Sequence, residues 1–474
     1  MVTTTPRSTR RSAGGARRAR VLERGVDGSA VTVSELPNGL RVVTESVPGA
    51  RSASVGVWVG VGSVDETARL AGASHYLEHL LFKGTHAHTG YEIADAFDAV
   101  GGEFNAFTAH EYTCYYARVL AQQAEMAVSL VSEVVLDAVI ATVDVDTERS
   151  VILEEIAMRD DDPEDTLADA FAAVVFAGHP VADPVIGTNE TIAAMSRAQV
   201  AGYYRRRYTP DKMVLAVAGG VEHGDVVRWA RAALGRFPAA GLPRDRSIAD
   251  GRADLIRPAP PRAGSPVRRR SAGAGAGPRL AMLERDIEQV HLSVGVRSGP
   301  RGADDRAALA VLTGALGGGM SSRLFRSIRE ERGLAYSVYA GTSTYADVGS
   351  FSVYAGCQPE HLGDVATLIG AELEQVAEHG VSDTELRRVQ GQLTGSLILA
   401  LEDTESRMSR IGKNLLVRSD YRSVDDELAE ISAVTADQVR AVAGRLLSGP
   451  RSAAVVGPFA AARDLPPEVT RLVG

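Results

Sequence analysis

Hydrophobic positions in the first half of the chain follow two different periods. Residues 52–61 and 105–119 alternate between apolar and other side chains, which predicts a strand in each segment. Residues 91–100, 122–136 and 145–159 carry apolar side chains three and four positions apart, which predicts three helices. The chain is therefore expected to contain both strands and helices.

Turn-forming residues separate these segments. The dipeptide Asn38-Gly39 lies between two β-rich runs and predicts a tight hairpin turn. Gly101-Gly102 interrupts the pattern before the second predicted strand, and Pro163 with its acidic neighbours ends the last predicted helix. We expect regular structure to begin near Val31.

The second half of the chain repeats the first half weakly. Ser54-Val55-Gly56-Val57 recurs as Ser293-Val294-Gly295-Val296. The predicted strand that ends at Ala218-Gly219 recurs at Val456-Gly457, with nearly the same spacing. Two matches at opposite ends of one interval predict a pair of duplicated domains.

A stretch rich in proline, arginine and glycine separates the two copies and has little periodicity, which is typical of a linker. A chain of 474 residues is also too long for one ordinary core. The predicted division is a disordered basic tail over residues 1–30, an N-terminal domain over 31–238, the linker over 239–278 and a C-terminal domain over 279–474.

The composition and charge of the chain argue against nucleic acid and membranes as its main partners. The formal net charge is −9 and the sequence pI is about 5.7, which argues against nucleic acid as the main partner. No apolar run reaches the length of a transmembrane helix, so we expect no membrane span. Cys114 and Cys357 lie far apart in sequence, which predicts two buried, inert thiols and a reducing compartment.

The N-terminal tail is basic, and its first 22 residues contain no acidic side chain. It has no apolar core of the kind found in a secretory signal, but its composition is typical of a mitochondrial transit peptide. Lysine, however, occurs only at Lys83, Lys212 and Lys413, whereas arginine is abundant throughout. The arginine content of the tail therefore reflects a preference for arginine over lysine in the whole chain, and it says less about targeting. We favour a bacterial cytoplasmic protein, with the mitochondrial matrix as the alternative.

The strongest chemical signal is the pattern H-x-x-E-H formed by His75, Glu78 and His79. On a helix the two histidines lie one turn apart on one face, which is the spacing that two imidazoles need to bind one zinc ion. Glu78 lies beside them, where it can accept a proton from a water molecule. This order reverses the common H-E-x-x-H motif and is the inverzincin signature. It predicts a metallopeptidase.

A catalytic zinc site has a third protein ligand and keeps one position open. The helix predicted over residues 145–159 is the obvious source, because Glu148, Ile152 and Glu155 share one of its faces. Glu155 could bind the metal while Glu148 hydrogen-bonds a histidine. Glu154 points about 100° away, so we expect it in solvent.

These residues give the chain a resemblance to the insulinase/pitrilysin family, in particular to the β-subunits of mitochondrial processing peptidase and their bacterial relatives. The resemblance runs from about residue 36 to residue 459. It implies that Glu155 is the distal zinc ligand, that Glu148 is a supporting acid and that Glu78 is the general base. The matching segments are Gly72-Ala73-Ser74-His75-Tyr76-Leu77-Glu78-His79, Phe82-Lys83-Gly84-Thr85, Gly101-Gly102, Asn105-Ala106, Glu148 and Val151-Ile152-Leu153-Glu154-Glu155.

The second half resembles the same family but has no copy of the zinc motif, since His75 corresponds to Gly314 in the repeat. Arg329 and Tyr336, seven residues apart, match the arginine and tyrosine that reach the scissile peptide in that family. The resemblance implies that they hydrogen-bond the substrate carbonyl and its developing oxyanion. A salt-bridging arginine and a core tyrosine are the alternative.

The family resemblance also implies a fold and an assembly. The fold is α+β, with two homologous domains that are each a mostly antiparallel sheet packed with helices, and two subunits enclose a chamber. An extended, unfolded peptide, presequence-like or otherwise, would pair with a sheet edge near Asn105 and Ala106. Arg329 and Tyr336 of one subunit would face the zinc ion of the other. Since the zinc motif is intact and a long glycine-rich loop is missing, we favour a homodimer over a pair of unlike subunits.

Two other functions are compatible with this sequence. One is a non-catalytic scaffold or processing-complex subunit similar to a core protein, although such relatives usually lose zinc ligands. The other is a metal-binding regulatory module without turnover. Ligand types alone also leave manganese and cobalt open beside zinc.

Overall fold

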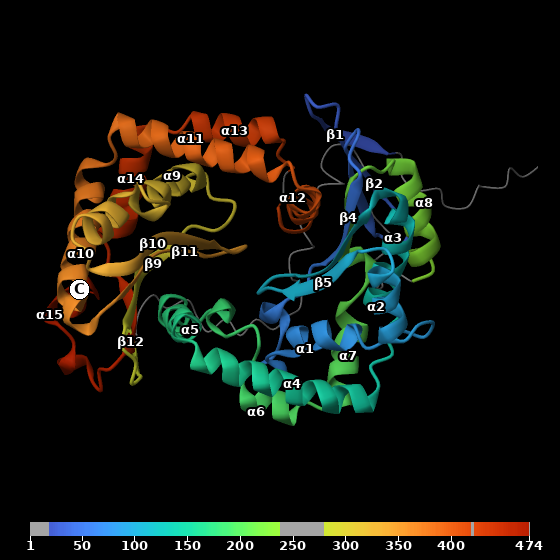
Figure 1. Ribbon diagram of the computed structural model, residues 1–474, viewed down its shortest axis with the longest axis horizontal. Coiled ribbons are helices and arrows are strands. Elements are labelled where there is room, and N and C mark those ends of the chain that lie inside the picture. Colours follow the sequence, from blue (N-terminus) through green and yellow to red (C-terminus); the bar gives the residue numbers. More distant parts are fainter. Residues whose placement is uncertain (1–18, 238–278, 419–420, 474) are drawn as a thin grey trace, which may run out of the picture.

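A computed structural model describes residues 19–237, 279–418 and 421–473 of the chain. Figure 1 shows two halves side by side, each built from one sheet and several helices. The linker predicted over residues 239–278 and residues 1–18 of the predicted tail lie outside the described residues. None of the described helices is both long enough and apolar enough to cross a membrane.

The first sheet has seven strands in the order β1-β2-β3-β7-β4-β6-β5. Neighbouring strands are antiparallel except for β3 and β7, which are parallel. The strands are β1 (Arg20–Arg24), β2 (Ala30–Glu35), β3 (Arg41–Ser46), β4 (Ser52–Val59), β5 (Glu103–Thr108), β6 (Thr113–Leu120) and β7 (Met213–Gly219).

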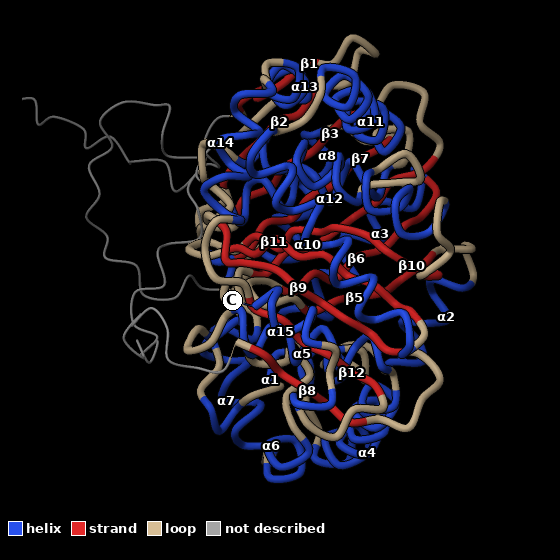
Figure 2. Tube along the Cα trace, turned by 90° about the vertical axis from the view of Figure 1, so that its left-hand side faces the viewer, coloured by secondary structure: helices blue, strands red, loops and turns tan. Residues whose placement is uncertain are grey.

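The second sheet has five strands in the order β10-β11-β9-β12-β8, and only β8 and β12 are parallel. Figure 2 shows the strands of both sheets running through the middle of the molecule between helical layers. The strands are β8 (Leu280–Glu284), β9 (Val290–Ser298), β10 (Ala335–Thr344), β11 (Gly349–Cys357) and β12 (Ser452–Gly457).

The two sheets share one topology. The order β3-β7-β4-β6-β5 in the first half corresponds strand by strand, with the same parallel pair, to β8-β12-β9-β11-β10 in the second. The repeated segments around Val55 and Val294 lie in β4 and β9, which are equivalent central strands. The α+β fold with two homologous domains is confirmed in this form, and each sheet is mixed.

Helices of the first half other than α5 lie on one side of the first sheet, and the buried side chains between them and the sheet form the largest apolar core of this half. The helices are α1 (Ala73–Leu81), α2 (Gly90–Asp98), α3 (Ala124–Leu136), α4 (Thr142–Asp161), α5 (Pro163–Val175), α6 (Asn189–Ala194), α7 (Arg197–Arg207) and α8 (His223–Leu234). Those of the second half are α9 (Arg306–Gly317), α10 (Leu362–His379), α11 (Asp383–Ala400), α12 (Thr404–Val417), α13 (Val424–Ser432), α14 (Ala436–Leu447) and α15 (Pro467–Val473).

One helix of each half packs on the sheet of the other half. Helix α12 packs on the second face of the first sheet, where Met408 and Ile411 lie against Trp58 and the apolar side chains of β7. Helix α5 packs on the second sheet, where Leu167 and Phe171 lie with β12. The apolar surface buried by this exchange holds the two halves together.

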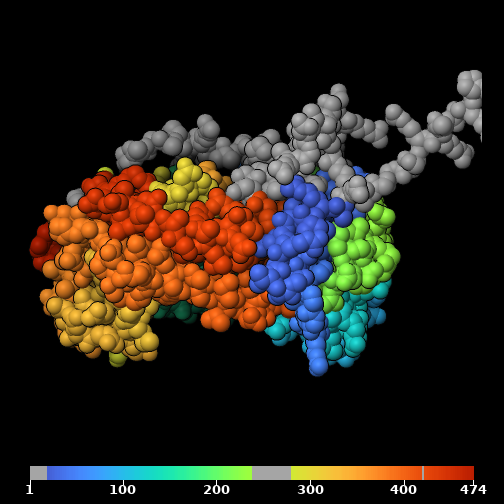
Figure 3. Space-filling view, turned by 90° about the horizontal axis from the view of Figure 1, so that it is seen from above, coloured from blue at the N-terminus to red at the C-terminus, as the bar shows by residue number. Residues whose placement is uncertain are grey.

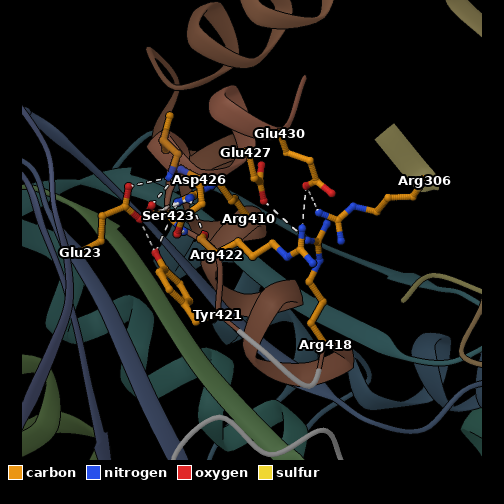
Figure 4. A network of polar contacts seen from close by, with 11 residues as sticks. Glu23, Arg306, Arg410, Arg418, Tyr421, Arg422, Ser423, Asp426, Glu427 and Glu430 are labelled. Atoms are coloured by element: carbon orange, nitrogen blue, oxygen red, sulfur yellow. Dashed lines mark hydrogen bonds and ion pairs between the residues drawn. The ribbon is translucent and has the colours of Figure 1, made fainter. Parts of the chain in front are cut away.

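Ion pairs add to the contact between α12 and the N-terminal strands, and Figure 3 shows the two surfaces meeting. Glu23 of β1 accepts a hydrogen bond from the hydroxyl of Tyr421 (2.6 Å) and pairs with Arg410 of α12 (3.3 Å). Its other oxygen accepts from the N–H of Val424 at the start of α13 (2.9 Å). Figure 4 shows Glu23 beside Tyr421 and Arg410. Strand β1 is thereby fastened to the second half of the chain.

The structure corrects two expectations about strands. Regular structure starts at Arg20, inside residues 1–30 where we expected a tail, because β1 pairs with β2 and is held by α12. Residues 105–119 form two strands, β5 and β6, instead of one. The turn between them contains no glycine or proline, and it is fastened by a bond between Ser63 Oγ and His110 Nδ1 (2.9 Å).

The other predicted elements agree with the structure. Asn38-Gly39 forms the turn between β2 and β3, with Gly39 at φ +89°, a conformation that suits glycine. Helices α2, α3 and α4 and strand β4 lie where the sequence predicts them, within a few residues. Pro163 ends α4 and opens α5, whose first N–H groups bond the side chain of Asp162. Both cysteines are buried and free.

Candidate metal centre

Helix α1 carries the H-x-x-E-H motif, and its start is fixed by one carboxylate. Glu66 accepts hydrogen bonds from the N–H groups of Gly72 (2.7 Å) and Ser74 (2.6 Å). These two acceptor oxygens satisfy N–H groups that have no partner within the first turn of the helix. These hydrogen bonds fix where α1 begins, and they thereby fix the position of the motif along the helix.

The buried face of α1 fixes how the helix is rotated. Tyr76, Leu77 and Leu80 are fully buried in the core of the first half. The Tyr76 hydroxyl donates a hydrogen bond to the carbonyl of Val145, which fastens α1 to α4. Figure 1 shows α1 between β5 and α4. The polar face with the motif residues is thus turned toward these two elements.

Gly72 makes the entry into α1 possible. Its φ is +90°, and a Cβ atom built on it would lie 2.5 Å from the carbonyl oxygen of Ile186. Gly72→Ala is therefore expected to lower the free energy of unfolding by about 1–3 kcal/mol. Denaturant unfolding measures the change. Gly49→Ala, where φ is +80° but the added Cβ has open space, is the matched control and should cost less.

His75, His79 and Glu155 come together as a three-ligand group. Glu155 Oε2 lies 3.7 Å from His75 Nε2 and 3.4 Å from His79 Nε2. One ligand atom from each residue lies within 4.8 Å of the other two. Among the described residues, this is the one group of three or more His, Cys, Asp and Glu side chains with such spacing.

The geometry of the group fits a tetrahedral zinc ion. Bond lengths of roughly 2.0–2.2 Å place neighbouring ligand atoms about 3.3–3.6 Å apart, close to both distances to Glu155 Oε2. Burial, and then the neighbouring His79, lower the pKa of His75 to about 4, so its ring is neutral at pH 7. Its Nε2 is the nitrogen that faces Glu155, while its Nδ1 is buried without a hydrogen-bond partner in the described residues. Neutral imidazole is the form that binds zinc.

Helix α4 supplies two acids with different surroundings. Glu148 Oε2 lies 3.0 Å from His79 Nδ1, and the Glu148 side chain is only 5% exposed. An acceptor on Nδ1 keeps the proton there and leaves Nε2 free for a metal. Glu155 is 37% exposed and reaches the two imidazoles. Glu154 is exposed to solvent, which the helical spacing predicts.

Glu78 lies on the same side of α1, next to the histidines. Its Oε2 accepts a hydrogen bond from the Thr108 hydroxyl at the end of β5 (2.5 Å). Burial raises the pKa of Glu78, and this hydrogen bond partly opposes the effect. A carboxylate with a raised pKa beside a metal group is suited to accept and return a proton near neutral pH.

Asn105 and Ala106 lie on β5, which is an edge strand of the first sheet. The Asn105 side chain is exposed, and its amide oxygen accepts a hydrogen bond from the N–H of Ala106 (2.8 Å). Within the part of the chain that the structure describes, β6 is the one strand that pairs with β5, and β5 also contacts α1. A free sheet edge therefore lies beside the helix that carries the metal ligands.

Arg329 and Tyr336 lie in the second half, close to each other. The guanidinium carbon of Arg329 is 5.0 Å from the centre of the Tyr336 ring. Tyr336 is 76% exposed and sits at a bulge in β10, while Arg329 belongs to a short π-helix. Within the described residues, no hydrogen bond, ion pair or ring contact joins either side chain to the group of His75, His79 and Glu155. The structure thus pairs the two residues without placing them at the metal group of the same chain.

Comparisons with known proteins agree with this geometry. The sequence profile described as "Insulinase (Peptidase family M16)" matches residues 41–189, and the profile described as "Peptidase M16 inactive domain" matches residues 194–393. The chain belongs to the M16, or insulinase, peptidase family. It is an M16 metallopeptidase with a His-His-Glu candidate site. The motif lies within the first profile match, and the second match begins before β7 of the first sheet and extends into the second half.

Several curated proteins resemble this M16 peptidase over most of their length. An uncharacterised zinc protease of Mycobacterium tuberculosis is 50% identical over 439 residues, which cover 93% of this chain and 96% of the relative. A zinc protease of Streptomyces coelicolor is 49% identical, with coverage of 90% and 89%. A zinc protease of Bacillus subtilis is 34% identical, with coverage of 89% and 97%.

Solved structures share the fold at low sequence identity. A protease from Helicobacter pylori superposes with a TM-score of 0.79 at 20% identity, over 90% of this chain and 99% of that chain. A protein of Pseudomonas fluorescens titled as a peptidase M16 inactive domain gives a TM-score of 0.76 at 20% identity, over 91% and 99%. Both support the two-domain α+β fold of the M16 peptidase.

The sequence did not predict two polar contacts of the M16 centre. Thr108 reaches Glu78 from a neighbouring strand, and Lys83 reaches Glu148 with an Nζ–Oε1 distance of 2.6 Å. Lys83 lies in the turn directly after α1, close in sequence to the motif, so it was at least a local candidate. No comparable signal exists for Thr108, since its contact depends on how β5 packs on α1.

The Thr108 hydroxyl should affect the pH dependence of the M16 peptidase. It lowers the pKa of Glu78, so Thr108→Val should raise that pKa. Because the general base must be ionised, the acidic limb of kcat/KM should then move to higher pH. A pH–rate profile of the metal-loaded enzyme measures the shift. Thr113→Val removes a hydroxyl that bonds the carbonyl of Val61, just after the end of β4, and should leave the limb in place.

Proposed function

We propose that this M16 peptidase is a zinc-dependent endopeptidase that hydrolyses extended, unfolded peptides. The observation that carries the proposal is the convergence of His75, His79 and Glu155 from two helices, with the carboxylate of Glu78 beside them. Three ligands leave one corner of a tetrahedral site for a reactant, as catalytic zinc sites do. The relatives named as zinc proteases support the same metal.

The three ligands would hold one zinc ion per chain. When bound, zinc supplies Lewis-acid chemistry that makes water a nucleophile near neutral pH and polarises a peptide carbonyl. His79 is kept in the metal-binding tautomer by Glu148, and His75 is kept neutral by burial. The chain's own residues thus prepare the ligand set before any metal or substrate arrives.

Glu78 moves the proton in the proposed reaction. Its carboxylate accepts the proton of the attacking water and returns it to the amine of the departing peptide half. The Thr108 hydroxyl holds one carboxylate oxygen, which leaves the other oxygen for proton transfer. The raised pKa of Glu78 favours both acceptance and release of the proton.

The free edge of β5 is the proposed substrate site. An extended peptide that adds to this edge would pair with backbone groups near Asn105 and Ala106, and α1 would lie beside the scissile bond. A folded protein cannot offer an extended strand, so we expect it to be spared. Presequence-like segments would satisfy this requirement.

Arg329 and Tyr336 complete the proposed site from a second copy of the chain. Tyr336 is 76% exposed, and within the described residues neither side chain has a hydrogen bond, ion pair or ring contact with the ligand group of its own chain. Both observations favour a homodimer in which two subunits enclose a chamber. Arg329 would stabilise the developing oxyanion as a cation, and the Tyr336 hydroxyl would donate a hydrogen bond to it. The cytoplasmic location stays a prediction that the bacterial sources of the named relatives favour.

The direct test is hydrolysis of an unstructured fluorogenic peptide before and after metal removal. Chelation should abolish cleavage, and added zinc should restore it. A folded protein containing the same peptide sequence should resist cleavage and serves as the substrate control. Activity that persists in the fully chelated protein, or zinc-loaded protein without any peptide cleavage, would contradict the proposal and favour a scaffold or a regulatory module.

A further inference from the structure

Lys83 connects the end of α1 to the acid that supports a metal ligand. Its Nζ lies 2.6 Å from Oε1 of Glu148, whose other oxygen lies 3.0 Å from Nδ1 of His79. We propose that Lys83 is a positioning residue of the metal centre, which sets zinc affinity through Glu148 and His79 without touching the ion. The proposal rests on the proposed function, because it concerns the same site.

The burial of Glu148 explains why this carboxylate needs a cation. The side chain is 5% exposed, and an ionised carboxylate is stable in such a place only when it is paired and hydrogen-bonded. Among the described residues, Lys83 is the one lysine or arginine within ion-pair distance of Glu148. Lys83 itself is 40% exposed, so its substitution leaves no buried charge of its own.

Each carboxylate oxygen of Glu148 contacts one partner. Oε1 accepts from Lys83, which fixes the rotation of the carboxylate and leaves Oε2 for His79. His79 must donate its Nδ1 proton to Oε2 so that its Nε2 faces Glu155. Without Lys83, the carboxylate could rotate or turn toward solvent, and the orientation of His79 would be less well defined.

The identity of the cation agrees with this role. Only three of the 51 lysine and arginine residues in the chain are lysines. An arginine fork presents two parallel N–H groups and tends to bind both oxygens of a carboxylate. At residue 83 it would compete with His79 for Oε2, whereas the compact ammonium group of lysine needs only Oε1.

Zinc affinity of the full chain, measured by competition with a chromophoric chelator, tests the proposal. Lys83→Met should weaken zinc binding by about 10- to 100-fold, the usual cost of losing an outer hydrogen-bond partner of a ligand. Lys83→Arg should fall between the wild type and Lys83→Met. Lys413→Met is the matched control, because Lys413 lies on α12, where its Nζ contacts the ring of Tyr112. The zinc affinity of this variant should equal that of the wild type.

A double variant tests the route of the effect. If Lys83 acts through Glu148, then Lys83→Met combined with Glu148→Gln should bind zinc as Glu148→Gln does alone. Wild-type affinity in Lys83→Met would overturn the proposal. So would fully additive losses in the double variant, or a lower melting temperature of the metal-free protein with unchanged zinc affinity. Lys83→Gln replaces Lys83→Met if the latter does not fold.

The outcome is separable from that of the proposed function, because zinc affinity is measured without substrate. A wild type that binds zinc tightly but cleaves no peptide would contradict the proposed function and leave the role of Lys83 standing. A wild type with zinc-dependent cleavage and a Lys83→Met variant of equal zinc affinity would overturn only the role of Lys83.

Discussion

Glu78→Gln should abolish peptide hydrolysis while the protein keeps its zinc ion. The amide has nearly the same shape as the carboxylate but cannot accept the proton of the attacking water. Loss of a general base typically costs about 100- to 10,000-fold in rate. The three ligands His75, His79 and Glu155 remain, so metal content should stay at one zinc ion per chain. Steady-state kinetics together with metal analysis of the same sample measures both quantities.

Glu154→Gln is the matched control for this variant. Glu154 lies on the exposed face of α4, next to the ligand Glu155 in sequence but pointing into solvent. It should leave both kcat/KM and zinc content unchanged. Full cleavage by the Glu78→Gln protein would exclude Glu78 as the base. Loss of zinc from that protein would mean that Glu78 acts as a ligand instead.

His75→Ala should lose both metal and activity. The substitution removes one of three ligands from a group in which Glu155 Oε2 lies within 3.7 Å of both imidazoles. The loss of zinc affinity should exceed the roughly 10- to 100-fold that follows from losing an outer hydrogen-bond partner. Chelator competition measures the affinity, and peptide cleavage at micromolar free zinc should be at background.

The control for this substitution is His379→Ala on the surface at the end of α10. His379 is 66% exposed and lies far along the chain from the metal ligands. Its removal should change neither zinc affinity nor cleavage. A His75→Ala protein that binds zinc as tightly as the wild type would contradict the assignment of the ligand. Circular dichroism should confirm that the variant is folded, since His75 is not part of the apolar core.

The metal ligands could be predicted because helical geometry is local. Spacing alone placed His75 and His79 on one face of α1, and Glu148 and Glu155 on one face of α4. The fold then brought these two faces together, as the distances to Glu155 Oε2 show. Similarity to the M16 family supported the ligand set, and the structure confirms that the three side chains converge.

The exchange of α5 and α12 between the halves was not predictable in the same way. The apolar face of α12 indicates that Met408 and Ile411 are buried, but periodicity does not say which sheet covers them. The same limit applies to β1, whose contact with the second half is made through Glu23 and residues about 400 positions away in the sequence. Long-range packing of this kind leaves no mark in the local pattern.

The sequence predicted one strand where the structure has the β5–β6 hairpin, because the turn between the two strands has no recognisable sequence signal. The turn consists of His110, Glu111 and neighbours that carry no usual turn signal. Partners distant in sequence hold it instead, including Arg301 of the second half, which pairs with Glu111. The error mattered for the site, because Thr108, which binds Glu78, ends β5 directly before that turn.

The most direct test of the central claim is anomalous diffraction at the zinc edge from crystals of the zinc-loaded protein. The account predicts one strong peak per chain, about 2.0–2.2 Å from His75 Nε2, His79 Nε2 and Glu155 Oε2, with a fourth position open to solvent. A peak elsewhere, or a zinc ion at the histidines with Glu155 beyond bonding distance, would contradict it.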